Sequence, residues 1–401
     1  MHISFNCMKI HRTLVNAIID TLRKIFQEGV YADKAVEQVL KSNSKFGSRD
    51  RKFIAENVYG IVRWWRLLAA ITETEENLYR IFAVWMIIRG SELPQWDEFS
   101  GIDKDQIISK HIDLQSTRKF RESVPDWLDE IASDELGESV WTQELASLNE
   151  EATVVLRVNK LKTEVSELQK ILNGKGVETE SDARYSDALL LKKRQNLHHL
   201  TEYKSGLFEI QDASSQLIAP FMELKQGMAV IDACAGAGGK SLHIAAMMKN
   251  QGKIISMDVE ERKLAELERR AKRGGVNIVQ TQLISDSTIN KLNATADRLL
   301  LDVPCSGLGV LKRNPDAKWK LSAEFIAEIK RTQQEIISHY SQMLKPGGIM
   351  VYATCSILPS ENQMQVEKFL NKNKDFEFIS DRKVLPSEGF DGFYMAKLTR
   401  K

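Results

Sequence analysis

The 401-residue sequence has little cysteine, little proline and no uninterrupted membrane-length apolar run. None of its four cysteines forms a Cys-x-x-Cys pair, which argues against a zinc site of ordinary spacing and against a disulfide framework. The apolar stretch VYGIVRWWRLLAAI is broken by Arg63 and Arg66, so it is a poor membrane span. The opening MHISFNCMKIHRTL lacks a secretory apolar core. These absences predict a cytoplasmic protein that uses neither a metal nor a membrane.

Neither positive nor negative charge predominates, since the formal net charge is +1. Any contact with nucleic acid must therefore come from local basic patches. The length exceeds what a single core usually organises, and we expect about two or three domains. Nothing in the sequence requires a second copy, so we expect a monomer.

The first part of the chain is patterned for helices. Apolar residues recur at helical spacing in LVNAIIDTLRKIF and FIAENVYGIVRWWRLLAAI, and no proline occurs before Pro94. We expect residues 1–93 to form a helical domain and residues 94–150 a linker followed by helices. The basic connection FGSRDRKF fits either a solvated helix end or an RNA contact.

Residues 151–212 change character. TVVLRVN, DALLLKK and GLFEIQD are typical of strands, and TEVSELQKILNGKG of a helix ended by glycine. The segment predicts a small α+β module. A plain structural module is the simpler interpretation, and Arg157, Lys160 and Lys162 at the end of its first strand indicate RNA docking as the more specific one. We take Arg157 and Asn159 as candidate RNA contacts.

From residue 213 to the end, buried strands alternate with helices, as in MAVIDACAGAGGKSLHIAAMM and KIISMDVEERKLAELERRAKRGG. This pattern predicts a Rossmann-like α/β domain with a mostly parallel sheet covered on both faces. Ligands of such sheets lie beyond the carboxyl ends of the strands. The rule gathers the glycine loop, Asp258, Cys305 and Cys355 along one edge.

The loop DACAGAGGK carries Gly236, Gly238 and Gly239 between a strand and a helix. Glycine permits close backbone approach, and a helix N-terminus favours negative groups. The spacing is not that of a Walker phosphate loop. Asp258, at the end of the next strand, suits a ribose, and Asp286 could reach an adenine amino group. These features alone leave open NAD, S-adenosylmethionine and a plain tight turn.

Cys305 and Cys355 end two apolar runs. Free cysteines are often small buried hydrophobic residues, but two beside a cofactor loop favour a nucleophile. A thiolate that adds to C6 of a pyrimidine makes C5 nucleophilic enough to accept a methyl group. Asp302, three residues before Cys305, is placed to assist at N3 of the base. Spacing does not decide which cysteine attacks.

Five motifs together resemble the Fmu/Sun family of S-adenosylmethionine-dependent RNA (cytosine-5) methyltransferases: QDASSQL, DACAGAGGK, DVPCSGLG, PGGIMVYATCSILPSEN and GFDGFYMAKL. The resemblance implies that Cys355 attacks C6, that Cys305 promotes release of the product and that Asp302 contacts the cytosine beside the cofactor. It assigns Asp258 to the ribose and Asp286 to the adenine. It assigns the cofactor loop to Cys234, Ala235, Gly236, Ala237, Gly238, Gly239 and Lys240, with Lys240 also facing the base. Family members usually have proline where this chain has Ala237, which removes no functional group.

The resemblance also suggests an RNA substrate. The helical start resembles the NusB-like domain of the ribosomal members through DRKFIAENVYGIVRW, which favours 16S ribosomal RNA, with transfer RNA as the alternative. The base must be unpaired or flipped to be reached. Beside Cys305, the cluster Lys312, Arg313, Lys318 and Trp319 suits contacts to phosphates and bases, although each residue alone is equally typical of a structural loop.

Three other functions remain to be weighed. A DNA cytosine methyltransferase is disfavoured by the NusB-like start and by the second Thr-Cys segment. A non-catalytic RNA-binding assembly factor is disfavoured by the intact cysteines, Asp302 and glycine loop. A nicotinamide dehydrogenase is disfavoured because no second nucleotide-binding half is apparent.

Overall fold

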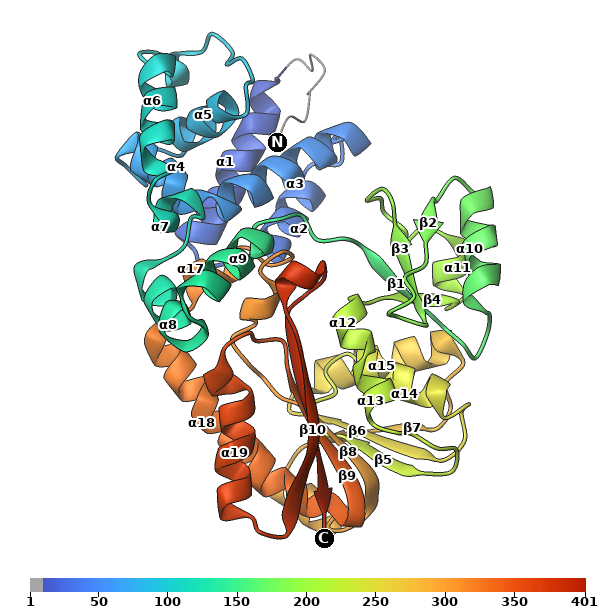
Figure 1. The fold of residues 1–401 in the computed structure, drawn as a ribbon. Coiled ribbons are helices and arrows are strands. Elements are labelled where there is room, and N and C mark those ends of the chain that lie inside the picture. The colour runs from blue at the N-terminus through green and yellow to red at the C-terminus, as the bar shows by residue number, and fades with distance from the viewer. Residues whose placement is uncertain (1–9) are drawn as a thin grey trace. The chain divides into compact units, whose positions relative to one another are not determined.

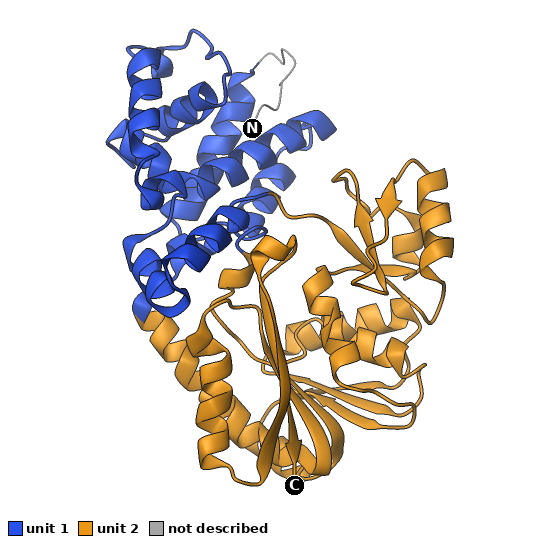
Figure 2. Ribbon diagram, in the orientation of Figure 1, with its two compact units in different colours: residues 1–150, 311–323 blue, residues 151–310, 324–401 orange. Residues whose placement is uncertain are grey.

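The computed structural model describes residues 10–401, so Cys7 lies outside the described residues. The chain groups into two compact units, one formed by residues up to 150 with 311–323 and the other by 151–310 with 324–401 (Figure 2). This grouping differs from the four consecutive segments expected from the sequence. Residues 94–150 join the helices that precede them, and a short segment after Cys305 joins the same unit.

The first unit is helical, as predicted. Its buried side chains form one core that includes Ile18, Ile54 and Phe82, all without solvent exposure. The helices at its start are α1 (Arg12–Phe26), α2 (Ala32–Ser42), α3 (Ser48–Arg63), α4 (Trp65–Thr72) and α5 (Leu78–Ile88).

The segment expected to begin as a linker is mostly helical. Helix α6 contacts α4 and α5, with Ile107 buried in the common core. The elements of this segment are η1 (Asp97–Phe99), α6 (Lys104–Leu114), α7 (Arg118–Arg121), α8 (Asp126–Leu136) and α9 (Glu138–Leu148). The polar sequence after Pro94 therefore reflects helices with one buried face, which a weak apolar pattern does not reveal.

The second unit begins with a small antiparallel sheet in the order β2-β3-β1-β4. Its strands are β1 (Val155–Val158), β2 (Thr179–Glu180), β3 (Ala188–Leu191) and β4 (Phe208–Ile210), with helices α10 (Val165–Gly174) and α11 (Thr201–Lys204). The three expected strands are present. Strand β2 was not predicted, because two residues are too few to show an alternating pattern.

A seven-stranded sheet follows in the order β10-β11-β9-β8-β5-β6-β7. Strands β9, β8, β5, β6 and β7 are parallel, whereas β11 runs antiparallel to both of its neighbours. The strands are β5 (Ala229–Asp232), β6 (Lys253–Asp258), β7 (Val279–Leu283), β8 (Ala296–Asp302), β9 (Leu344–Thr354), β10 (Phe376–Val384) and β11 (Phe393–Arg400). The prediction of a mostly parallel sheet is confirmed.

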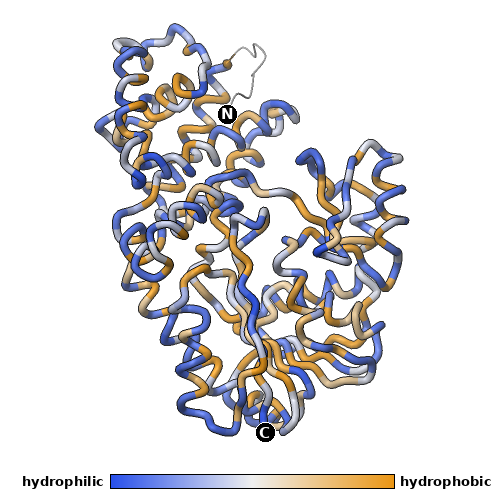
Figure 3. The backbone as a smooth tube through the Cα atoms, in the orientation of Figure 1, coloured by the Kyte–Doolittle hydropathy of each residue, from blue (hydrophilic) through white to orange (hydrophobic). Residues whose placement is uncertain are grey.

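Helices cover both faces of this sheet (Figure 1). Leu299 and Leu301 of β8 pack in one core with Phe369 of α19, while the intervening Leu300 packs in another with Ile244 of α14. This alternation explains why β8 is apolar throughout, and Figure 3 shows the same hydrophobic strands. The helices are α12 (Ala213–Gln216), α13 (Ile218–Phe221), α14 (Gly239–Met247), α15 (Glu261–Gly274), α16 (Asp286–Lys291), α18 (Ala323–Tyr340) and α19 (Gln363–Lys372).

Short 3-10 turns complete the chain. They are η2 (Leu308–Val310), η3 (Ser341–Met343), η4 (Pro359–Glu361) and η5 (Pro386–Glu388), and α17 (Ala317–Lys320) lies in the segment that belongs to the first unit. Over residues 10–401, no helix has both the length and the apolar character needed to cross a membrane.

Candidate active site

The two strand-end cysteines meet. Cys305 follows β8 and Cys355 follows β9, and these strands are parallel neighbours with Asp302 in register with Ala353. The two Sγ atoms lie 3.3 Å apart, and both cysteines are half-buried and unbridged. The sequence placed them on one sheet edge, and the pairing of β8 with β9 brings their sulfurs into contact.

The environment of the pair changes the pKa of Cys305. The hydrogen bond with Cys355, burial, and the nearby negative charge of Glu361 raise the pKa of Cys305 well above the usual value of a thiol. Cys305 therefore keeps its proton at neutral pH, and either sulfur can be the donor in the contact between the two thiols. A protonated thiol this close to a second thiol suits a pair in which Cys305 is not the attacking group.

Close backbone packing fixes the position of Cys355. The amide of Gly309 donates to the Cys355 carbonyl at 2.9 Å, and the amide of Gly392 donates to the Gly309 carbonyl at 2.8 Å. A Cβ at Gly309 would collide with the carbonyl oxygens of both Cys355 and Gly392. The start of β11 thus holds the segment after Cys305 against the segment that carries Cys355.

A lysine and a carboxylate pair beside the thiols. Lys240, near the start of α14, donates to Oδ2 of Asp302 at 2.5 Å, and its Nζ lies 5.3 Å from the centroid of the Phe393 ring. Burial alone would lower the pKa of Lys240, but the charge and hydrogen bond of Asp302 raise it above its usual value. Lys240 is therefore a cation at neutral pH, and it also interacts electrostatically with Cys355.

The glycine loop has the conformation that the sequence suggested. Gly236 and Gly238 adopt φ values of +53° and +83°, which side chains with a Cβ rarely adopt. The amide of Gly236 donates to Oδ2 of Asp258, and the amide of Glu260 donates to Oδ1, both at 2.9 Å. At Gly238 a Cβ would overlap Leu267 of α15, whereas at Gly236 it would meet no atom within 4 Å. The loop is packed on one side and open on the other.

These residues fit a bound nucleoside that carries no phosphate. The open side of Gly236 leaves room above the loop, and the Asp258 carboxylate can accept hydrogen bonds from ribose hydroxyls. Asp232, at the end of β5, is fully buried, and its Oδ1 has no hydrogen-bond partner, while Oδ2 accepts from Ser241. No lysine or arginine of the kind used by phosphate loops is present in the loop before Lys240. The geometry therefore suits S-adenosylmethionine better than a dinucleotide.

Tyr340, at the end of α18, lies near the glycine loop and was not predicted from the sequence. Burial, followed by the charges of Cys234, Asp286 and Asp258, raises its pKa to about 12. The tyrosine therefore lies within electrostatic reach of three of the residues assigned to the cofactor. Asp286 itself is 88% exposed at the first position of α16, with its Oδ1 4.0 Å from Nδ1 of His339.

Two candidate RNA contacts lie inside the second unit instead of on its surface. Arg157 is 4% exposed and donates to Gln211 and to the carbonyl of Gly239 in the cofactor loop. Asn159 donates to the carbonyls of Gly206 and Gly274, each at 2.8 Å. Both side chains join the small sheet to the methyltransferase-like domain, so their observed role is structural and we do not carry them forward as RNA contacts.

A second arginine also supports the loop. Arg270 of α15 donates to the Ala237 carbonyl at 2.6 Å and to Oε2 of Glu209 at 3.0 Å. The resemblance to the Fmu/Sun family led us to expect proline at the position of Ala237, and this contact holds the carbonyl of the alanine in place. Arg270 could not be singled out by its sequence context, because it lies among many charged residues of an amphipathic helix.

The basic cluster after Cys305 is folded into the first unit. Lys312 and Lys318 are 4% and 2% exposed. Trp319 donates from Nε1 to the Val62 carbonyl at 2.6 Å, and Lys318 lies 3.4 Å from Oδ1 of Asn149. Arg313 is half-buried. Burial gives the two lysines a structural role, and the hydrogen bond to Val62 gives one to the half-buried tryptophan, while an RNA contact by Arg313 stays a prediction.

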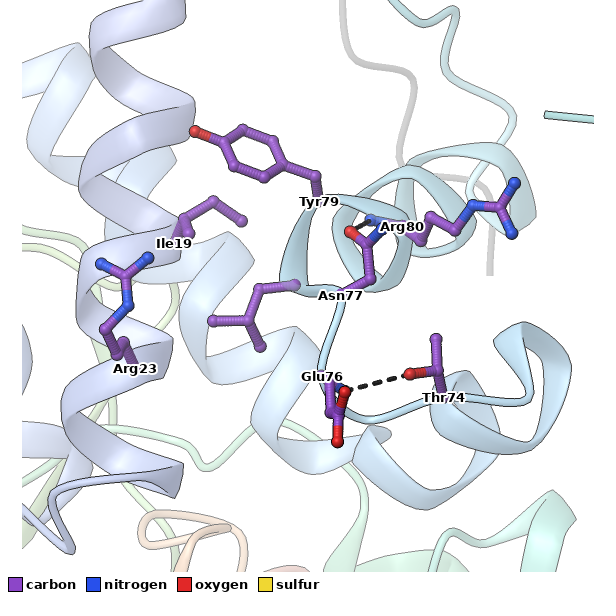
Figure 4. Close-up of a pocket in the computed structure, with 8 residues that line it drawn as sticks. Ile19, Arg23, Thr74, Glu76, Asn77, Tyr79 and Arg80 are labelled. Atoms are coloured by element: carbon purple, nitrogen blue, oxygen red, sulfur yellow. Dashed lines mark hydrogen bonds between the residues drawn. The ribbon is translucent and has the colours of Figure 1, made fainter. Parts of the chain in front are cut away.

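A cavity of about 520 Å³ in the first unit lies away from this chemistry (Figure 4). It is lined by Arg23 of α1, by Arg80 of α5 and by the turn between α4 and α5. Asn77 caps α5 by accepting from the Arg80 amide. The cavity contains no thiol and no residue of the glycine loop. Residues 10–401 also contain no cluster of histidine, cysteine and carboxylate side chains suited to a metal ion.

The fold and the paired cysteines define a class of protein, a Rossmann-like methyltransferase with two thiols at the carboxyl ends of adjacent strands. A family model described as 16S rRNA methyltransferase RsmB/F matches residues 219–399. A second, described as the RsmF/B-like ferredoxin-like domain, matches residues 124–198, and together they cover more than half of the chain. The chain belongs to this RsmB/F methyltransferase family, which confirms the resemblance to the Fmu/Sun enzymes.

Individual relatives agree with this assignment. Ribosomal RNA small subunit methyltransferase B of Vibrio cholerae is 33% identical over 69% of this chain and 65% of its own length. The chain thus spans just under two thirds of that relative. A probable ribosomal RNA small subunit methyltransferase B of Synechocystis is 29% identical over 94% of this chain and 97% of its own length. The solved structure of PH0851 has a TM-score of 0.84 at 24% identity, covering 98% of this chain and all of that one, and shows the same fold.

Proposed function

We propose that the protein transfers a methyl group from S-adenosylmethionine to C5 of a cytosine in 16S ribosomal RNA. The observation that carries this proposal is the 3.3 Å contact between the sulfurs of Cys305 and Cys355, beside the Lys240–Asp302 pair and the glycine loop. Methylation of a ring carbon is the chemistry that needs a nucleophile together with a proton donor at this place.

Each residue then has one task. The Cys355 sulfur bonds to C6 of the cytosine while Asp302 assists at N3, and the electron pair moves toward C5. S-adenosylmethionine, when bound, supplies the electrophilic methyl group. After transfer a water molecule takes the C5 proton, the electrons of that C–H bond restore the C5–C6 double bond, and the bond between C6 and Cys355 breaks with its electron pair on sulfur. Cys305 assists that release, and the positive charge of Lys240 keeps the Asp302 carboxylate in place.

The choice of ribosomal RNA is supported by the matching family model and by the names of the two relatives. We infer that the exposed Asp286, Asp258 and the loop from Cys234 to Lys240 hold the cofactor, with Tyr340 closing the site. Such a protein acts in the cytoplasm, and a monomer suffices because every residue assigned to the reaction comes from the second unit.

Methyl transfer from labelled S-adenosylmethionine to purified small-subunit ribosomal RNA and to transfer RNA tests the proposal. We expect label in ribosomal RNA only, and bisulfite mapping should place it on C5 of a cytosine that is unmodified in a deletion strain. Label in transfer RNA alone would show that the substrate is transfer RNA and not ribosomal RNA. Cofactor binding without transfer to either RNA would favour a non-catalytic binding factor.

A further inference from the structure

A fully buried carboxylate lies behind the two catalytic thiols. Glu361, the last residue of η4, has no solvent exposure. Its Oε2 accepts from the Ser306 amide at 2.8 Å and from Nε2 of Gln333 at 3.0 Å. Its Oε1 accepts from the hydroxyls of Ser306 and Ser356, each at 2.5 Å. A buried carboxylate is costly unless it is fully hydrogen-bonded, and here four donors satisfy it.

The donors come from the two loops that carry the thiols. Ser306 follows Cys305, and Ser356 follows Cys355. Glu361 therefore bridges the two loops at the positions adjacent to the reactive residues. Gln333 of α18 extends the bridge, because the same Nε2 also donates to the Pro304 carbonyl, just before Cys305, at 3.0 Å.

The next residue completes the arrangement on the Cys355 side. Asn362 donates to the Ser356 carbonyl at 2.9 Å and accepts from the Thr354 hydroxyl at 2.5 Å. Thr354 and Ser356 flank Cys355, so Asn362 fixes the loop around this cysteine. Glu361 connects that loop to the Cys305 loop, where the Ser306 and Ser356 hydroxyl oxygens also lie 3.2 Å apart.

We propose that Glu361 is a positioning residue that sets the distance between the Cys305 and Cys355 sulfurs. The inference deepens the proposed function, on which the catalytic meaning of that distance rests. A carboxylate suits this position because all four partners can donate to it. A glutamine can still accept from the Ser306 amide and Gln333 with its oxygen, but its NH₂ group then faces the two hydroxyls, which lose their hydrogen bonds to a charged group. Its negative charge also contributes to keeping Cys305 protonated.

The spacing of the sulfurs can be measured without RNA or cofactor. Phenylarsine oxide binds tightly only where two thiols can both bond to its arsenic, with release of water. We expect the wild-type protein to bind it far more tightly than Cys305→Ala or Cys355→Ala. In Glu361→Gln the affinity for phenylarsine oxide should fall about tenfold or more, as expected for lost hydrogen bonds to a charged group. Alkylation of Cys355 by iodoacetamide, which needs one thiol only, should change much less.

Glu367→Gln is the matched control, because Glu367 is an exposed glutamate on the following helix. It should bind the arsenical as the wild type does. If Glu361→Gln does not fold, as judged by circular dichroism, Ser356→Ala removes a single donor and should also weaken binding. The proposal would be overturned if the folded variants bound phenylarsine oxide as tightly as the wild type does. It would also be overturned if the wild type bound it no better than Cys305→Ala or Cys355→Ala.

A second readout separates this inference from the proposed function. With ribosomal RNA and S-adenosylmethionine, Glu361→Gln should retain a covalent RNA adduct longer than the wild type, because Cys305 is no longer held beside Cys355. If the wild type methylates no RNA, the proposed function fails while the arsenical result still stands. If methylation occurs and Glu361→Gln turns over normally, the positioning role fails by itself.

Discussion

Nζ of Lys240 lies 2.5 Å from Oδ2 of Asp302, and this contact joins the cofactor loop to the strand that leads to Cys305. The lysine stands at the start of α14 and the carboxylate at the end of β8, 62 residues later. The lysine holds the half-buried Asp302 side chain in place at the end of β8 through this ion pair.

Replacing Asp302 by asparagine should slow methyl transfer. The variant keeps the side-chain shape but loses the carboxyl group that can carry a proton to N3, and it leaves the Lys240 cation without its carboxylate. We expect the rate at saturating substrates to fall about 100-fold, the usual scale for a group that assists proton transfer. The exposed Asp375→Asn is the control. Wild-type activity in Asp302→Asn would remove the carboxylate from the mechanism.

Arg157→Met tests the placement of a residue first assigned to RNA. Because its guanidinium holds the Gly239 carbonyl, we expect S-adenosylmethionine to bind about tenfold more weakly in isothermal titration calorimetry. Binding of RNA without cofactor should not change. Arg194→Met, on the exposed surface of the same small domain, should affect neither. Weaker RNA binding with normal cofactor affinity would instead restore Arg157 as an RNA contact.

Lys318→Met tests the basic segment after Cys305. Burial, with Arg63 nearby, lowers the pKa of Lys318 well below its usual value, and its hydrogen bond to Asn149 is long at 3.4 Å. An apolar side chain of similar length should therefore leave the melting temperature unchanged or raise it. RNA affinity in a filter-binding assay should stay at the wild-type level. A folded variant with reduced RNA affinity would show that the lysine reaches the substrate.

The burial of these basic residues could not be predicted from the sequence, although the strands could. Apolar runs such as LLLD predicted β8 correctly, because a strand covered on both faces must be apolar throughout. The same logic placed both cysteines at one edge. Whether Arg157 or Lys318 faces solvent depends on neighbours more than 80 residues away, such as Gly239 and Asn149, and no local pattern encodes that.

Glu361 was missed for a related reason. It was within a recognised motif, ILPSEN, but a glutamate after a turn is usually solvated, and only the fold reveals its four donors. The grouping of residues 311–323 with the helical unit likewise depends on contacts such as that of Trp319 with Val62. Strand positions follow from composition along the chain, whereas burial of charge follows from packing between distant segments.

Asp232→Asn should change the pH dependence of stability. Burial raises the pKa of Asp232 from 3.8 to about 6 in the folded protein. Between these values the unfolded chain ionises while the folded protein keeps the proton, so rising pH favours unfolding. The unfolding free energy of the variant relative to wild type should therefore increase by up to about 3 kcal/mol from about pH 4 to pH 7. Urea titrations at several pH values measure it, and a pH-independent difference would refute the shift.

The central claim is that Cys355 attacks the base and Cys305 releases it, and trapping the RNA–protein adduct tests it most directly. Each single variant, the double variant and the wild type would be mixed with labelled small-subunit ribosomal RNA and S-adenosylmethionine, then separated on a denaturing gel. Adduct should accumulate in Cys305→Ala and be absent from Cys355→Ala and from the double variant. Adduct in Cys355→Ala but not in Cys305→Ala would reverse the two roles, and adduct in neither would contradict the covalent mechanism.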